Sequence, residues 1–145
     1  MTEPGGGPGQ VLDPVDLILR RVPRVWVVPS DEGPRASSQA FNNDRDGGPM
    51  SGYLDSLLVQ YGLTRGQILD GHAPGEFFVA ALTVGFLQSE DQTIVPDPIV
   101  PTQHICDPAH VGVAGNKAPG RRSRLARASR WVPGVGPEGG RVLGQ

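Results

Sequence analysis

The side chains of this chain best suited to proton chemistry lie in one short stretch, residues 104–110. It holds two of the three histidines, the single cysteine and an aspartate. An imidazole changes charge near neutral pH, so such a group suggests acid–base chemistry or ligand binding. These residue types also bind metals, but Pro108 prevents a continuous helix and no paired Cys or His spacing is present. We expect no metal and no cofactor, and take His110, at the start of a predicted strand, as the first candidate.

A second group of polar side chains flanks the first apolar segment. Arg21 lies in that segment, and Ser37 and Ser38 lie in the polar loop that follows. A guanidinium and paired hydroxyls suit a phosphate or carboxylate, through bidentate hydrogen bonds. His72 lies in another loop, before a long apolar run. If folding brings these four side chains to His110, they form a cleft for an anionic ligand.

Basic residues concentrate near the end of a chain whose formal net charge is −2. Residues 117–145 hold 7 of the 13 Lys and Arg residues. The cluster predicts contact with phosphate or nucleic acid through Arg121, Arg122, Arg124 and Arg127. The alternative is a helix that simply keeps its long cationic side chains in water.

The length and composition indicate one domain. The chain has 145 residues, of which 21 are Gly and 15 are Pro. These concentrate in residues 1–10 and 133–145, which we expect to be disordered tails around a single domain over residues 11–132. A lone cysteine indicates a reducing compartment. No run approaches the roughly 20 apolar residues that cross a bilayer, and the first residues do not resemble a signal peptide. We expect a cytoplasmic protein with no membrane contact.

The hydrophobic pattern predicts a mixture of helices and strands. A helix is predicted over residues 11–22 and a strand over 24–28, with one strand over 17–28, broken near Pro23, as the alternative. A mostly irregular loop follows to residue 49, with a turn at residues 37–41 that a serine could cap.

Beyond the loop, residues 50–62 have the clearest helical spacing of apolar side chains. The further predicted elements are a helical turn over 64–69, a buried strand over 77–87, strands over 92–95 and 109–114, and a helix over 120–131. Helices and strands do not alternate regularly. We therefore expect an α+β fold, a single small domain with a mostly antiparallel sheet and helices on one face.

Three short segments resemble those of a group of small bacterial proteins with no known activity. The segments lie at residues 19–23, 34–41 and 107–113. They are similar to that group's Arg-Arg-(Ile/Val)-Pro, Pro-Ser-Ser-Gln-Ala-Phe and (Asn/Asp)-Pro-Ala-His motifs. Here Ala36 stands in place of the proline and Asp107 in place of asparagine. The resemblance implies a bacterial source and four positions of interest: Arg21, Ser37, Ser38 and His110.

These observations leave three functions open, and whether the protein is an enzyme is uncertain. The first is a binding module for an anionic ligand, such as a nucleotide, phosphate or nucleic acid. The second is a small phosphoryl- or ADP-ribosyl-transferring enzyme, with His110 as base, His72 as partner acid and Arg21 stabilising negative charge. The third is a protein-interaction module without a small ligand.

Overall fold

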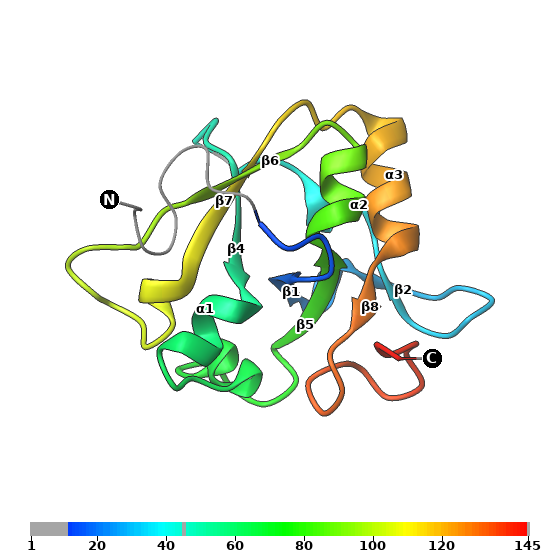
Figure 1. Cartoon of the computed structure of the whole chain (residues 1–145). Helices are drawn as coiled ribbons and strands as arrows, with labels where there is room; N and C mark the ends of the chain where they lie inside the picture. Colours follow the sequence, from blue (N-terminus) through cyan, green and yellow to red (C-terminus); the bar gives the residue numbers. More distant parts are fainter. Residues whose placement is uncertain (1–11, 45, 145) are drawn as a thin grey trace.

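The computed structural model describes residues 12–44 and 46–144, and its centre is a six-stranded sheet (Figure 1). Every pair of neighbouring strands is antiparallel, in the order β6-β7-β4-β1-β5-β8. The strands are β1 Leu17–Pro23, β4 Met50–Leu54, β5 Phe77–Thr83, β6 Thr93–Pro96, β7 His110–Ala114 and β8 Arg130–Trp131. The predicted α+β fold, a single small domain with an antiparallel sheet, is confirmed.

Three α-helices and four short 3-10 helices connect these strands. The α-helices are α1 Asp55–Gln60, α2 Val84–Ser89 and α3 Pro119–Ala128. The 3-10 helices are η1 Arg24–Trp26, η2 Ser38–Phe41, η3 Arg65–Leu69 and η4 Asp107–Ala109. A two-stranded hairpin, β2 Val27–Val28 with β3 Arg35–Ala36, stands beside the main sheet. Figure 1 shows α2 and α3 next to each other and α1 well away from them.

Helical segments cover both faces of the sheet, where we expected them on one. Arg20 and Arg21 are neighbours in β1, so their side chains point to opposite faces. The Arg20 guanidinium donates to the Ala40 carbonyl of η2, and that of Arg21 donates to the Ile68 carbonyl of η3. The element η2 therefore lies on the face opposite to η3.

The first apolar segment is a strand. Residues 17–23 form β1, as in the alternative interpretation, and the helix predicted over residues 11–22 is absent from its described part, residues 12–22. All seven residues of β1 pair with β5, so partners from distant sequence override the local helical pattern. The strand predicted over residues 24–28 is shorter, because η1 follows Pro23 and only Val27–Val28 remains extended.

The segment with the clearest helical spacing divides into a strand and a helix. Residues 50–54 form β4, which pairs with β1 and β7, and only Asp55–Gln60 is helical. A Cβ on Gly52 would lie 2.9 Å from Ile18 Cγ2, so glycine allows the close approach of β4 to β1. The strand predicted over residues 77–87 divides in the same way, at Thr83, whose hydroxyl accepts the Phe86 N–H and caps α2.

Several local predictions are confirmed. The turn after Ser37 is η2, although no serine side chain caps it. The helical turn after Thr64 is η3, where the Gln67 side chain accepts the Thr64 N–H at 2.7 Å. Strands β6 and β7 are where they were predicted, within a residue of the expected bounds. The last helix begins as predicted but ends at Ala128, and Arg130–Trp131 is a strand.

The end of the chain is tied to the sheet, where the composition predicted a disordered tail. Trp131 donates its N–H to the Arg141 carbonyl at 2.9 Å and accepts the Leu143 N–H at 2.9 Å. Val79 of β5 donates to the Val135 carbonyl at 2.9 Å. This segment covers the outer edge of β8 (Figure 1). The tail predicted over residues 1–10 lies outside the described residues.

Candidate functional site

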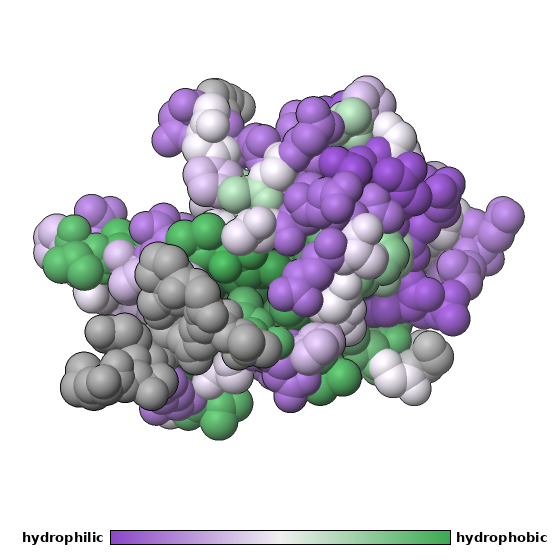
Figure 2. Space-filling view, turned by 45° about the horizontal axis from the view of Figure 1, so that its top comes forward, coloured by the Kyte–Doolittle hydropathy of each residue, from purple (hydrophilic) through white to green (hydrophobic). Residues whose placement is uncertain are grey.

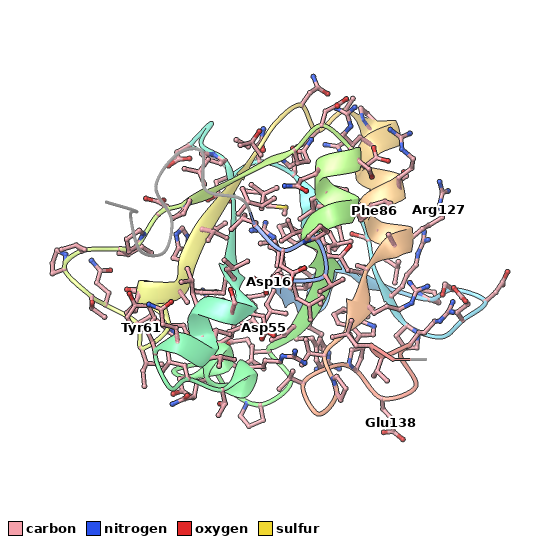
Figure 3. The ribbon with its side chains drawn as sticks, in the orientation of Figure 1. Asp16, Asp55, Tyr61, Phe86, Arg127 and Glu138 are labelled. Atoms are coloured by element: carbon pink, nitrogen blue, oxygen red, sulfur yellow. The ribbon has the colours of Figure 1, made fainter. Side chains whose placement is uncertain are left out.

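A cleft of about 320 Å³ lies between the β2–β3 hairpin, the C-terminal end of α3 and the last residues of the chain. Four guanidinium groups and two carboxylates line it, and we call it the arginine cleft. Its charged residues are Asp31, Glu32, Arg35, Arg127, Arg130 and Arg141. Figure 2 shows hydrophilic side chains gathered on the side of the molecule that carries α3, and Figure 3 shows Arg127 leaving α3 on the side of the hairpin.

Helix α3 supplies one wall of the arginine cleft. Arg127 lies in the last turn of the helix and its side chain is exposed. Arg130 follows the helix, and its Nη1 donates to the carbonyls of Arg127 at 2.9 Å and Ser129 at 2.8 Å. These bonds satisfy carbonyl groups at the negative end of the helix dipole. Arg130 is therefore held in place, while Arg127 extends into solvent.

The last residues of the chain supply the opposite wall, and Trp131 positions them. Its indole Nε1 donates to the Pro34 carbonyl of the hairpin at 2.9 Å. A Cβ on Gly140 would overlap with Trp131 Cδ1, so glycine lets the chain pass over the indole. The next residue, Arg141, forms an ion pair with Glu32 of the hairpin. The arginine cleft thus depends on contacts between residues about a hundred positions apart.

The charges of the arginine cleft are not balanced within the protein. The described residues contain one ion pair across the cleft, between Arg141 and Glu32. In that same part of the chain, neither Arg35 nor Arg127 forms an ion pair, and both side chains are exposed. Two guanidinium groups of the cleft, those of Arg35 and Arg127, therefore have no carboxylate partner among the described residues.

The first half of α3 differs. Arg124 contacts Glu90 at 3.0 Å, and Arg121 contacts Glu90 and Asp91, each at 3.3 Å. Hydrogen bonds from Arg124 are the main reason why the pKa of Glu90 is lowered. Of the four arginines predicted to contact phosphate or nucleic acid, only Arg127 lines the cleft. The fourth, Arg122, is half-buried, and its Nε has no hydrogen-bond partner among the described residues.

Arg21 and His110, the two ends of the cleft predicted from the sequence, lie on one face of the sheet. Tyr53 lies between them: it pairs with Leu19 of β1, two residues from Arg21, and with His110 of β7. Side chains two residues apart in a strand share a face, as do directly opposed residues. The Tyr53 and His110 rings are 5.8 Å apart at their centroids. We call this group, together with His104, the histidine face.

Arg21, His104 and His110 of the histidine face each donate a hydrogen bond to a backbone carbonyl. Arg21 Nη1 donates to the Ile68 carbonyl at 2.9 Å, and His110 Nδ1 donates to the Asp97 carbonyl at 2.8 Å. His104 uses both ring nitrogens: Nε2 donates to the Asp70 carbonyl at 3.0 Å, and Nδ1 accepts an N–H at 3.1 Å. This pattern requires the neutral imidazole with its proton on Nε2. Each of these three side chains is therefore tied to a backbone carbonyl of the protein.

The histidine face also lacks a ready nucleophile. Cys106 is fully buried, and burial raises the pKa of its thiol to about 11. Burial likewise raises the pKa of the Tyr53 hydroxyl, although Arg21 opposes this effect. Asp107, also buried, accepts the N–H groups of Gln103 at 2.7 Å and His104 at 2.8 Å and so holds their loop. Within residues 12–44 and 46–144, no three His, Cys, Asp or Glu side chains are arranged to hold a metal ion.

The remaining predicted site residues lie elsewhere. His72 packs on Phe77 at 4.5 Å between ring centroids, and Arg21 approaches the same ring at 5.8 Å. Ser37 and Ser38 begin η2, on the face opposite to Arg21, and the Ser37 hydroxyl is buried without a partner among the described residues. The structure therefore brings Arg21, His72 and His110 to one face and leaves the serines on the other.

Three arginines of the arginine cleft were not predicted as site residues: Arg35, Arg130 and Arg141. The high density of arginine after residue 117 could have indicated Arg130 and Arg141 as site residues. Lys117, at the start of this density, is instead buried, and its Nζ donates to oxygens of Asn43, Val113 and Gly115 at 2.7, 2.8 and 3.2 Å. Burial is the main reason why its pKa falls to about 8.

Comparison with known proteins adds no assignment to this geometry. The chain matches no family model, and no curated protein or solved structure is significantly similar to it. The chemistry of the site therefore rests on its own side chains.

Proposed function

We propose that this protein is a binding module for an anionic ligand, and that the arginine cleft is its binding site. The observation that carries the proposal is the surplus of unpaired guanidinium donors in a defined cleft. Four arginines and two carboxylates line it, and three of the arginines have no ion pair within the described residues. Of these three, Arg130 donates to backbone carbonyls, so Arg35 and Arg127 remain without a partner. Arg35 and Arg127 are therefore available to a ligand in a defined cleft, whereas Arg24, which is also exposed and has no ion pair among the described residues, lies outside that cleft.

The residue type supports an anion with several oxygens. Arginine presents a planar fork of N–H donors that matches phosphate and carboxylate oxygens in pairs, and it stays charged at physiological pH. Arg130 is fixed by its own bonds to the end of α3, so part of the site is preorganised. Preorganised donors lose less conformational entropy when a ligand binds.

An enzyme, and the nucleic-acid form of the first function, have less support. An enzyme that uses His110 as a base would need a ring that faces substrate, but the ring is buried and hydrogen-bonded to Asp97. A surface for a nucleic-acid backbone would need the arginines along α3 to be free, but Arg121 and Arg124 are paired with Glu90. Neither observation affects the arginine cleft.

We also propose that the protein works in the cytoplasm of a bacterium. A reducing compartment would keep the buried Cys106 as a free thiol. No helix in the described part of the chain combines the length and apolar character that crossing a membrane needs.

Titration calorimetry tests the binding function. Inorganic phosphate, citrate, AMP and a short single-stranded oligodeoxynucleotide are titrated into the full-length protein at low ionic strength, where surface electrostatics are strongest. The protein with Arg35→Gln and Arg127→Gln is compared with Arg24→Gln, which removes an exposed arginine outside the cleft. We expect at least one anion to bind, with affinity lost in the double variant and kept in the control. Binding of no anion, or equal binding by both variants, would refute the proposal.

A further inference from the structure

We infer that the arginine cleft takes a compact dianion of the phosphate monoester type, and that Glu32 competes with this ligand for Arg141. The inference rests on the anion-binding function proposed above. It names the charge, size and internal competitor of the same site.

The charge of the cleft matches a dianion. Its four guanidinium groups and two carboxylates leave a net charge of plus two. A phosphate monoester carries about −1.5 to −2 charges at neutral pH and has three strong acceptor oxygens. A sulfate monoester has similar geometry but only one charge. The cleft is therefore expected to prefer the phosphate ester.

The basic surface is local and does not form a track. Arg121, Arg124 and Arg127 follow one another at three-residue spacing along α3, so they share one side of the helix. The first two meet Glu90 and Asp91 in the turn after α2, and only the third reaches the cleft. A polymer of phosphates would lose its cationic partners within one turn of the helix. A single phosphate group needs no such continuation.

The cleft also lacks a platform for a nucleobase. Its indole, Trp131, is 3% exposed, and its Nε1 already donates to Pro34. Bases bound by proteins commonly stack on an exposed aromatic face, which contributes about 1–3 kcal/mol per base. The volume of about 320 Å³ is at the small end for ligand pockets. The phosphate group is therefore the part of the ligand that the cleft can recognise.

Glu32 already occupies the position of an anion beside Arg141. It lies in a tight turn in which Gly33 donates its N–H to the Ser30 carbonyl at 3.0 Å, and its side chain is exposed. Arg141 is held by the hydrogen bond from the Trp131 N–H to its carbonyl. The Arg141 Nη1 group donates to the Glu32 carboxylate, so it cannot make the same hydrogen bond to a phosphate. A ligand that takes this donor must displace Glu32, and a dianion displaces it more readily than a monoanion does.

Matched ligands and variants test this inference. Phenyl phosphate, phenyl sulfate, succinate, AMP and a short oligodeoxynucleotide are titrated at neutral pH into the wild-type protein, Glu32→Gln and the control Glu138→Gln. Glu138 is an exposed carboxylate of the same C-terminal segment, outside the cleft (Figure 3). We expect phenyl phosphate to bind about tenfold more tightly than phenyl sulfate, AMP to gain nothing from its base, and Glu32→Gln to tighten binding of phenyl phosphate about two- to fivefold.

The outcomes separate this inference from the proposed function. The preference for a phosphate monoester would be contradicted by equal affinity for the two esters or by tighter binding of the oligodeoxynucleotide. The competition by Glu32 would be contradicted if Glu32→Gln changed the affinity no more than Glu138→Gln does. The anion-binding function would stand in each of these cases. If no anion binds to the wild-type protein, or if substitution of Arg35 and Arg127 does not change anion affinity, the inference and the proposed function both fail.

Discussion

The arginine cleft and the histidine face contain similar side chains but use them in opposite ways. On the histidine face, Arg21, His104 and His110 end on the carbonyls of Ile68, Asp70 and Asp97. In the arginine cleft, Arg35 and Arg127 find no carboxylate partner among the described residues. The side chains that the sequence suggested for chemistry largely stabilise the fold. Arg35 and Arg127, which the sequence did not bring together as a site, are available to a ligand.

The buried cations follow the same rule as the histidine face. Arg20 donates to the carbonyls of Ala40 at 2.9 Å and Ser51 at 2.6 Å, and Asp44 lies 3.8 Å from it. Lys117 satisfies its three donors with three oxygens. A cation whose donors are used inside the protein holds the fold together. A cation that lacks such partners is available to a ligand.

The largest expected effect comes from the residue that joins the cleft to the core. Trp131→Ala removes a buried indole and the bond that holds the hairpin, so we expect the free energy of unfolding to fall by about 3–5 kcal/mol. Denaturant unfolding measures this loss. Trp131→Phe should recover most of the packing but not the bond to Pro34. If Trp131→Ala leaves stability unchanged, the C-terminal segment is not anchored as described.

A smaller effect is expected on the histidine face. Asp107→Ala leaves the N–H groups of Gln103 and His104 without their acceptor, at a cost of about 1–3 kcal/mol in the free energy of unfolding. Anion affinity at the arginine cleft should not change, because the two regions share no contact through this loop. Loss of anion affinity together with stability would contradict their separation.

Lys117, a buried cation bonded within the protein, is expected to make the free energy of unfolding depend on pH. Its pKa is about 8 in the folded protein and about 10.5 when unperturbed. Between these values the unfolded chain binds more protons, so the contribution of Lys117 makes the free energy of unfolding rise with pH. Lys117→Met should lack this rise, and the wild-type minus variant difference should increase by at most about 1.4 kcal/mol per pH unit. Cys106 titrates in an overlapping range but cancels in this difference. A difference that stays flat from about pH 8 to 10.5 would contradict a buried ammonium.

The smallest stability change is expected within α3 itself. Arg127→Gln should lower the affinity for phenyl phosphate about tenfold and leave the free energy of unfolding within about 0.5 kcal/mol. Arg124→Gln should leave the affinity for phenyl phosphate unchanged. It breaks the ion pair with Glu90, which should lower the free energy of unfolding only slightly. Equal loss of affinity in both variants would favour a basic track along the whole helix.

Local signals predicted part of the fold. The helical turn that follows Thr64, the strand that begins at His110 and the start of α3 depend on neighbours in the sequence. The strand at residues 50–54 does not depend on neighbours in the sequence. The apolar spacing there suits a helix as well as a strand, and pairing with β1 and β7 decides for the strand. Arg21 and His110 lie on one face of the sheet, and Tyr53 rather than a serine lies between them.

The arginine cleft could not be predicted because its charges are assigned by distant contacts. Glu90 and Arg124 are 34 positions apart, and Glu32 and Arg141 are 109 positions apart. Composition shows that arginines are abundant after residue 117, but not which of them meet a carboxylate. Those pairings decide which arginines are free.

The most direct test is to map the binding surface. Backbone amide shifts of the isotopically labelled full-length protein are followed by NMR during titration with phenyl phosphate. We expect the shifts to concentrate at the hairpin around Arg35, at the end of α3 around Arg127, and at Arg141, with little change at Tyr53 and His110. Shifts centred on Tyr53 and His110 would show that the histidine face is the binding site and would contradict the account.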